Sequence, residues 1–243
     1  MKYTGISEIG LYRKENQDKI AVVEREHALL AILCDGIGGA NAGSIASNLC
    51  VTMLKDAFLE SSEVVDVEST VSWFGKLIKE INKAIYHESL VVPEYHGMGT
   101  TLVAAILFAD IVVVFNIGDS RLYVYSEGNL QLMTQDETYA YELYLRNEIS
   151  LDEANMHPKR NILMNAVGID EHISFQTKVI DFKWDKILMS SDGLHGYVDD
   201  TAISKVMEKG SILEIREGLL ELSYTAGAYD NISIIMIEGD KND

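Results

Sequence analysis

Short apolar runs rich in β-branched residues recur along this chain, and they constrain its fold more than any other feature. Such runs are typical of buried strands. Most of them follow one another directly, while helical patterns fall into two groups, within residues 42–89 and 199–225. A doubly wound parallel sheet would need strands and helices to alternate, so this order predicts antiparallel sheets in an α+β fold. The predicted strands are 19–23, 28–34, 100–108, 111–118, 121–133 (with a hairpin turn at 127–129), 174–182, 186–190 and 232–239, and the predicted helices are 42–59, 69–89, 199–209 and 212–225.

Nothing in the sequence divides the chain into separate folding units. It has two prolines, Pro93 and Pro158, and no linker rich in serine, glycine or proline. We therefore expect residues 1–243 to form one domain. The polar stretch 135–168 interrupts the strand pattern and is predicted to be a surface insertion, with a capping box formed by Ser150 and Glu153.

The charge and the cysteines limit the partners and the compartment. The chain has 38 acidic and 20 basic residues, a formal net charge of −18. A chain this acidic repels phosphate backbones and anionic lipids, so we expect no nucleic-acid or membrane partner. Cys34 and Cys50 lack CxxC spacing, and the first residues lack the apolar stretch of a signal peptide. These features predict a cytoplasmic protein, and we expect a monomer.

Four aspartates interrupt apolar strands in the same way. Asp35, Asp119 and Asp192 each follow a predicted strand, and Asp230 precedes one. Taken singly, each is better explained as a turn residue, because Asp-Gly and Asp-Asn are common in turns. Since the end of one antiparallel strand lies beside the start of its neighbour, all four can gather on one rim of the sheet core. Converging carboxylates repel one another unless a cation neutralises them, so together they favour a metal site.

The available ligands indicate which metal and which chemistry. Oxygen ligands without histidine or cysteine favour Mg²⁺ or Mn²⁺ and also admit Ca²⁺. Gly36 has no Cβ to crowd a cation, so its carbonyl is a further candidate ligand. Two metals of this kind suit the hydrolysis of a phosphate ester. Arg13 is a candidate for gripping the phosphate, although a lone loop arginine is by itself better explained as an exposed surface charge.

Seven ordered motifs resemble those of the metal-dependent protein phosphatases of the PP2C (PPM) family. They extend over nearly the whole chain, which resembles a compact bacterial member without an appended domain. The motifs are RKENQD (13–18), CDGIGGANAG (34–43), GMGTTLVAAIL (97–107), FNIGDSRLYVY (115–125), HPKRNILMNAVG (157–168), LMSSDGLHGYVDD (188–200) and YDNISIIMIE (229–238).

The resemblance implies a fold and a role for each site residue. The fold is a four-layer αββα sandwich of two antiparallel β-sheets flanked by helix pairs, and the stretch 135–168 matches the flap that is associated with substrate choice. By their positions in the motifs, Asp35 is expected to bridge two metal ions, Asp192 and Asp230 to complete the ligands of the first ion, and the Gly36 carbonyl to bind the second ion, with Asp18 beside it. The resemblance further implies a third metal site at Asp119 and Asp192, and a place for Asn231 next to the ligands. Arg13 is expected to bind the phosphate of the substrate.

The chain departs from the family pattern at three positions. Gln17 stands where many members have a glutamate ligand, so direct ligation of the second metal is expected to be lighter. Ile37 stands where eukaryotic members have a histidine proposed as the general acid, and Glu137 replaces a frequent histidine of the flap. His195 is a candidate substitute acid, although a loop histidine without such a role is the favoured interpretation.

We therefore expect a Mg²⁺- or Mn²⁺-dependent phosphatase, with two or three ions, that hydrolyses phosphoserine and phosphothreonine. The resemblance implies direct attack by a metal-bridging hydroxide, with Arg13, Asp35 and Asp192 as the catalytic residues. The expected partners are phosphorylated proteins, the substrates of a serine/threonine kinase. The main alternative is a phosphatase-like regulatory module with weak or no catalysis, which the retained carboxylates disfavour. A metal nuclease conflicts with the net charge of −18.

Overall fold

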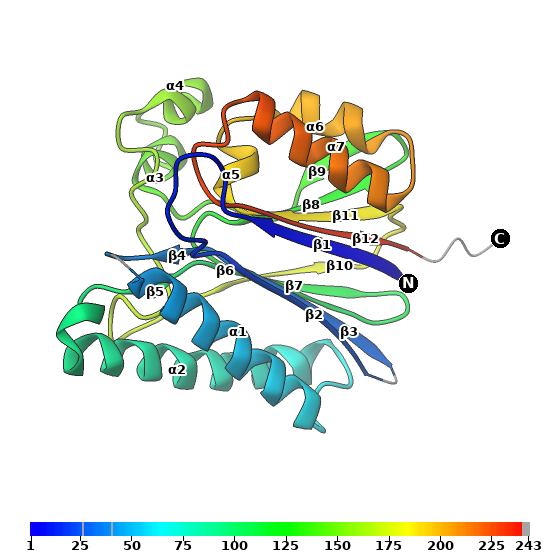
Figure 1. The fold of residues 1–243 in the computed structure, drawn as a ribbon. Coiled ribbons are helices and arrows are strands. Elements are labelled where there is room, and N and C mark those ends of the chain that lie inside the picture. The colour runs from blue at the N-terminus through cyan, green and yellow to red at the C-terminus, as the bar shows by residue number, and fades with distance from the viewer. Residues whose placement is uncertain (26, 40, 240–243) are drawn as a thin grey trace.

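Two five-stranded antiparallel sheets lie face to face in the computed structural model, which describes residues 1–25, 27–39 and 41–239. Helices cover the outer face of each sheet, and a separate pair of short helices stands at one end (Figure 1). The predicted α+β class and the four-layer αββα arrangement are therefore confirmed.

The first sheet has the strand order β1-β12-β11-β8-β9, and all its neighbours run antiparallel. Both faces of its central strands are covered, so every residue of β12 from Ile232 to Ile237 is buried, and not only alternate ones. The strands of this sheet are β1 (Lys2–Glu8), β8 (Arg121–Ser126), β9 (Asn129–Leu132), β11 (Lys186–Ser190) and β12 (Ile232–Glu238).

The second sheet has the order β10-β7-β6-β3-β2 and is also antiparallel throughout. A two-stranded sheet pairs Gly36 with Thr100 at the end of the sandwich where residues 135–168 lie. The strands are β2 (Lys19–Arg25), β3 (Ala28–Cys34), β4 (Gly36–Ile37), β5 (Gly99–Thr100), β6 (Leu102–Leu107), β7 (Val112–Ile117) and β10 (Gln176–Ile180).

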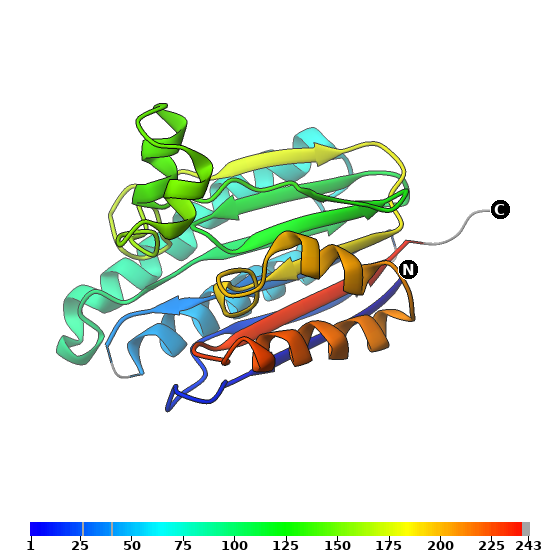
Figure 2. The same cartoon turned by 90° about the horizontal axis from the view of Figure 1, so that it is seen from above.

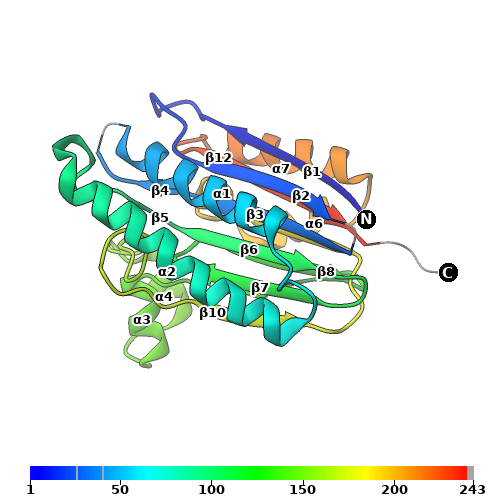
Figure 3. The same ribbon diagram turned by 90° about the horizontal axis from the view of Figure 1, so that it is seen from below.

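Helix pairs complete the outer layers. Helices α1 (Ala42–Glu60) and α2 (Val67–Val91) lie on the second sheet (Figure 3), and a 3₁₀ turn (Pro93–Tyr95) follows α2. Helices α6 (Asp200–Met207) and α7 (Ile212–Thr225) lie on the first sheet (Figure 2), and the single turn α5 (Asp192–His195) precedes them.

Three apolar layers hold the sandwich together, as the four-layer arrangement requires. One lies between the first helix pair and the second sheet, one between the sheets, and one beneath α6 and α7. Representative buried members are Phe58, Phe74 and Phe115 in the first layer, Leu33, Val114 and Ile235 in the second, and Tyr123, Leu188 and Leu219 in the third.

The stretch 135–168 stands apart from these layers. It contains α3 (Tyr139–Leu145) and α4 (Leu151–Met156), which pack on each other at the end of the sandwich. Ser150 and Glu153 form the predicted capping box of α4. No helix within the described residues is long and apolar enough to cross a membrane.

Candidate active site

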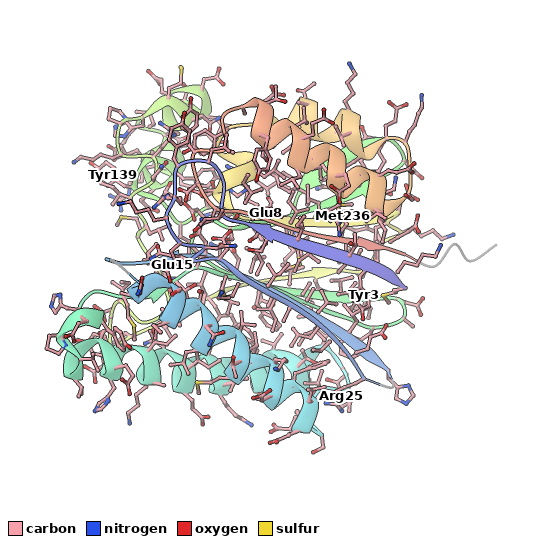
Figure 4. All side chains as sticks on the ribbon, viewed as in Figure 1. Tyr3, Glu8, Glu15, Arg25, Tyr139 and Met236 are labelled. Atoms are coloured by element: carbon pink, nitrogen blue, oxygen red, sulfur yellow. The ribbon has the colours of Figure 1, made fainter. Side chains whose placement is uncertain are left out.

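The candidate site residues lie where the chain crosses between the two sheets. The loop 9–18 joins β1 of the first sheet to β2 of the second, and Gly118–Ser120 joins β7 back to β8. Both crossings lie at the end that carries the flap, where Figure 4 shows Glu15 and Tyr139, whereas Tyr3 lies at the other end. The four aspartates therefore gather at one end of the sandwich, to which both sheets contribute, and not on the rim of a single sheet.

Asp192 and Asp230 come from neighbouring strands of the first sheet. Asp192 follows β11 and begins α5, while Asp230 precedes β12, which pairs with β11. The two loops are in close contact, since a Cβ on Gly193 would lie 1.9 Å from the carbonyl oxygen of Asn231. Glycine after Asp192 thus allows α5 to start against β12.

Asp35 comes from the second sheet and is held by its backbone. Its N–H donates to Thr101 Oγ1 at 3.0 Å, and its carbonyl accepts from the Thr101 N–H at 2.8 Å and from Thr100 Oγ1 at 3.0 Å. These three hydrogen bonds fix the backbone of Asp35 and do not involve the oxygens of its carboxylate.

Gly36 is required for a different reason from the one the sequence suggests. A Cβ at Gly36 would lie 2.2 Å from the Gly43 carbonyl oxygen and 2.7 Å from that of Gln17. The Gly36 N–H also donates to the Gln17 carbonyl at 3.2 Å. The absence of a side chain therefore lets the strand end approach the start of α1, which brings loop 9–18 beside Asp35.

Asp18 is almost fully buried between the sheets, with 1% of its surface exposed. Ser191 Oγ donates to Asp18 Oδ2 at 2.7 Å and accepts from the Ser233 N–H at 2.9 Å. Sequence reasoning did not single out Ser191 or Thr101. In the sequence, each belongs to a pair of adjacent serines or threonines at the end of a strand. The serine pair directly precedes Asp192, and the threonine pair directly precedes the strand β6, which pairs with the strand that ends before Asp35.

The aspartates perturb one another because they are buried together. Burial, followed by the charges of the neighbouring carboxylates, raises the pKa values of Asp35 and Asp192 well above their ordinary range. Burial raises the pKa of Asp18 to about 6 and that of Asp119 to about 7. Negative charge is therefore concentrated at this end of the sandwich to a degree that favours a bound cation.

The donor set fits divalent metal ions of the hard, oxygen-binding kind. Asp18 Oδ1 and Asp192 Oδ1 are buried without a hydrogen-bond partner, which is costly unless a cation or water contacts them. Across the described part of the chain, no three acidic, histidine or cysteine side chains already stand in a metal-binding arrangement. Asp230 is instead paired with Arg13, while burial and the neighbouring carboxylates raise the pKa values of Asp35 and Asp192.

Arg13 contacts one of the four aspartates, Asp230. Its guanidinium pairs with Asp230 at 2.5 Å, and its side chain is half exposed. Burial acts in the opposite direction, but the hydrogen bond and charge of Asp230 raise the pKa of Arg13. Asn231 fixes the loop that carries Arg13, because its side chain accepts from the Gln17 N–H at 2.8 Å and donates to the carbonyls of Ile9 and Glu15.

His195 lies beside the site and is poorly suited to act as a general acid. Its Nδ1 lies 2.9 Å from Ser190 Oγ. Burial, with a smaller contribution from Arg121, lowers the pKa of His195 well below its usual value. The ring is therefore neutral near pH 7 and carries no imidazolium proton to give.

The flap is anchored to the loop of Asp119 by Glu137. Glu137 Oε2 accepts from the Gly118 N–H and from Asn165 Nδ2, both at 2.9 Å, and the backbones of Gly118 and Glu137 also bond. Next to this anchor, Arg121 donates to both oxygens of Asp136 at 2.9 and 2.7 Å. The glutamate that departs from the family pattern thus has a structural function in this chain.

A pocket of about 500 Å³ lies between the flap and α5. Asp119 and Asp192 stand on its wall on the side of the candidate site. Tyr141 and Arg160 of the stretch 135–168 also line it, and so does Tyr197, which follows α5 in the chain. The flap therefore forms one side of the cleft that leads to the aspartates.

The chain has close relatives in both sequence and structure. Residues 13–214 match the family described as protein phosphatase 2C. The serine/threonine phosphatase stp of Listeria monocytogenes is 35% identical over 234 residues, covering 95% of this chain and 93% of that protein. The serine/threonine protein phosphatase PstP of Mycobacterium tuberculosis is 30% identical over 98% of this chain, which corresponds to 45% of that longer protein.

The solved structures give the same result. The crystal structure of the serine/threonine phosphatase Stp1 from Staphylococcus aureus matches with a TM-score of 0.92 at 33% identity, over 98% of this chain and 95% of that one. A crystal structure of a bacterial serine phosphatase matches with a TM-score of 0.93 at 32% identity, over 100% and 99%. The predicted family is confirmed, and this chain belongs to the protein phosphatase 2C family.

Proposed function

We propose that this chain removes phosphate from phosphoserine and phosphothreonine in proteins, with the aspartate end of the sandwich as its catalytic centre. It is a metal-dependent serine/threonine protein phosphatase. The observation that carries the assignment is the convergence of Asp18, Asp35, Asp119 and Asp192 from both sheets, with two buried oxygens lacking partners, beside an exposed arginine.

Membership of the protein phosphatase 2C family suggests a role for each residue. Asp35, Asp192 and Asp230 would hold the first of two Mn²⁺ or Mg²⁺ ions, and Asp35 with the Gly36 carbonyl would hold the second, near Asp18. Asp119 and Asp192 provide a third site. When bound, the ions supply an activated water and neutralise the phosphoryl oxygens.

Arg13 binds the phosphate of the substrate. Its guanidinium is exposed enough to meet a ligand and is positively charged at every physiological pH. Two parallel N–H groups match two phosphoryl oxygens, which orients the ester for attack. Asn231 keeps the loop in place, so the arginine is positioned before substrate arrives.

Proton delivery to the departing serine or threonine does not come from residue 37 or 195. Ile37 has no proton to give, and His195 is neutral near pH 7. The proton would therefore come from water or from another group at the aspartate end. This distinguishes the chain from members with a histidine at the position of Ile37.

The proposal also includes the domain organisation, the substrates, the oligomeric state and the compartment. Residues 1–243 act as one catalytic domain, with 135–168 as the flap beside the cleft. The substrates are phosphoproteins made by a serine/threonine kinase, the enzyme acts as a monomer, and nucleic acid and membrane are not its partners. Cys34 and Cys50 are both buried free thiols, which suits the reducing cytoplasm.

Turnover of p-nitrophenyl phosphate and of a phosphoserine peptide tests the proposal. We expect hydrolysis that requires Mn²⁺ or Mg²⁺, that a chelator abolishes, and that Asp35→Asn removes. Asp110→Asn is the matched control, since Asp110 is an exposed turn aspartate between β6 and β7. Binding of both ions and peptide without turnover would instead support the regulatory alternative.

A further inference from the structure

Three tyrosine rings form a continuous row on the surface next to Arg13. The rings of Tyr12 and Tyr229 are stacked, with centroids 5.0 Å apart and planes at 23°, and those of Tyr229 and Tyr197 are 5.5 Å apart at 40°. Tyr12 is 66% exposed, Tyr229 49% and Tyr197 36%. Exposed apolar side chains are usually scattered, so a contiguous row of aromatic rings indicates a binding surface. We call these three residues the tyrosine row.

The backbone beneath the tyrosine row is fixed. The Leu11 N–H donates to the Ala228 carbonyl at 2.9 Å, which joins the loop of Tyr12 to the loop of Tyr229. Gly227 has φ +118°, and a Cβ there would lie 2.3 Å from the Tyr229 ring. The ring is thus folded over a position that only glycine accommodates. Rigid aromatic rings lose little conformational entropy when a ligand binds.

The tyrosine row is continuous with the catalytic centre. Tyr12 directly precedes Arg13, and Tyr229 directly precedes Asp230. Tyr197 also lines the pocket that holds Asp192. An extended peptide advances about 3.3 Å per residue, so a peptide whose phosphate meets Arg13 brings its neighbouring side chains alongside the row.

The size and chemistry of the tyrosine row indicate its occupant. Three tyrosines with these exposures present at most about 400 Å², well below the roughly 800 Å² per partner of a stable protein–protein interface. The surface therefore suits one or two side chains rather than a second copy of this chain. The row consists of three aromatic rings, and Leu11, which is 64% exposed, directly precedes Tyr12, so the surface favours an apolar group.

Resting on the proposed function, we propose that the tyrosine row binds an aromatic or large aliphatic side chain of the phosphoprotein, one or two residues from the phosphorylated one. The row thereby selects among substrates, while Arg13 and the aspartates act on the phosphate. Aromatic packing of this kind adds to the transition-state affinity only for substrates that carry such a side chain.

Paired phosphopeptides test the inference. The peptides are identical except for phenylalanine or glycine beside the phosphoserine, and p-nitrophenyl phosphate reports the catalytic centre alone. We expect wild type to prefer the phenylalanine peptide about tenfold in kcat/KM, equivalent to about 1.4 kcal/mol. Tyr12→Ala combined with Tyr229→Ala should abolish this preference and leave the glycine peptide and p-nitrophenyl phosphate unchanged.

Two controls keep the result specific. Tyr12→Phe combined with Tyr229→Phe retains the rings and should retain the preference. Tyr3→Ala removes a tyrosine that is 41% exposed at the other end of the molecule (Figure 4) and should change nothing. If the double alanine variant folds poorly by circular dichroism, Tyr12→Ala alone, which removes the most exposed ring, should still reduce the preference.

Several results would overturn the inference. One is the absence of a peptide preference in wild type, and another is an equal loss on all three substrates in the alanine variant. A third is a dimer in sedimentation that the alanine variant dissociates without changing peptide preference, which would identify a second copy as the occupant. Absence of turnover on every substrate would refute the proposed function itself, and the inference with it.

Discussion

Two groups of buried charge lie at the same end of this molecule, and the fold treats them in opposite ways. Arg121 and Asp136 satisfy each other through two hydrogen bonds, with side chains 16% and 11% exposed. Within the described residues, Asp18, Asp35, Asp119 and Asp192 form no ion pair, and their pKa values are raised instead.

The paired group stabilises the fold, whereas the aspartate group serves the function of the protein. The paired group joins β8 to the start of the flap and needs nothing from solution. The aspartate group is unfavourable in the metal-free fold, and a bound divalent cation offsets that cost. We therefore expect substitutions in the first group to change stability, and substitutions in the second to change activity and metal binding.

The largest expected effect is on turnover. Asp192→Asn should lower kcat on p-nitrophenyl phosphate by about 100-fold or more, because electrostatic groups at the reacting centre contribute on this scale. The same substitution should leave the metal-free protein at least as stable as wild type, since it removes repulsion. Steady-state kinetics and urea unfolding measure the two effects. A variant that keeps its turnover would contradict the assignment of this aspartate.

The next effect is on stability. Asp136→Asn removes the carboxylate that accepts two hydrogen bonds from Arg121 and leaves this buried guanidinium with only Tyr123 Oη at 3.0 Å and Asp200 at 4.0 Å, so it should lower the free energy of unfolding by about 3 kcal/mol. Glu142→Gln is the matched control, because it breaks the exposed pair with Arg146 and should cost less than about 1 kcal/mol. Equal losses in chemical denaturation would show that the contrast between buried and exposed pairs is wrong.

The pH dependence of stability sharpens the same comparison. A carboxyl group whose pKa is raised by folding stabilises the fold below its unfolded pKa, near 4, and this stability is lost as pH rises through the folded value, about 6 for Asp18 and about 7 for Asp119. Metal-free protein should therefore melt at a lower temperature at pH 8 than at pH 5. Saturating Mn²⁺ should remove or reverse this slope, and an unchanged slope would argue against cation binding at these groups.

The smallest effect concerns the flap. Glu137→Gln keeps the shape of the side chain but weakens the hydrogen bonds from Gly118 and Asn165, so it should lower stability by about 1 kcal/mol. Peptide turnover should change more than that of p-nitrophenyl phosphate, because the flap lines the cleft and not the phosphate site. Identical changes on both substrates would place the effect in the catalytic centre instead.

Much of the fold is predictable from sequence because its central strands are buried on both faces. The apolar runs predict β3 and β11 at their observed bounds, and the Glu127-Gly128 turn between β8 and β9 lies within the predicted hairpin. The pattern does not predict β1, KYTGISE, because an edge strand with a polar face carries a weak apolar signal. The structure shows that β1 is a strand because its backbone pairs with β12.

The candidate site is less predictable, because its geometry depends on contacts between distant segments. Motif positions identify the aspartates and Arg13, yet Ser191 and Thr101 become visible only when the sheets are assembled. Gly36 illustrates the limit: sequence predicts open space for a cation, whereas the structure shows a close approach to Gly43. The tyrosine row is equally hidden, since its members are far apart in the chain.

The most direct measurement of the central claim is calorimetric titration of metal-free protein with Mn²⁺, with turnover of p-nitrophenyl phosphate followed in the same samples. We predict that at least two ions bind, that turnover rises with their occupancy, and that Asp35→Asn loses both while Asp110→Asn keeps both. Turnover that is independent of Mn²⁺, or ion binding that Asp35→Asn leaves unchanged, would contradict the account.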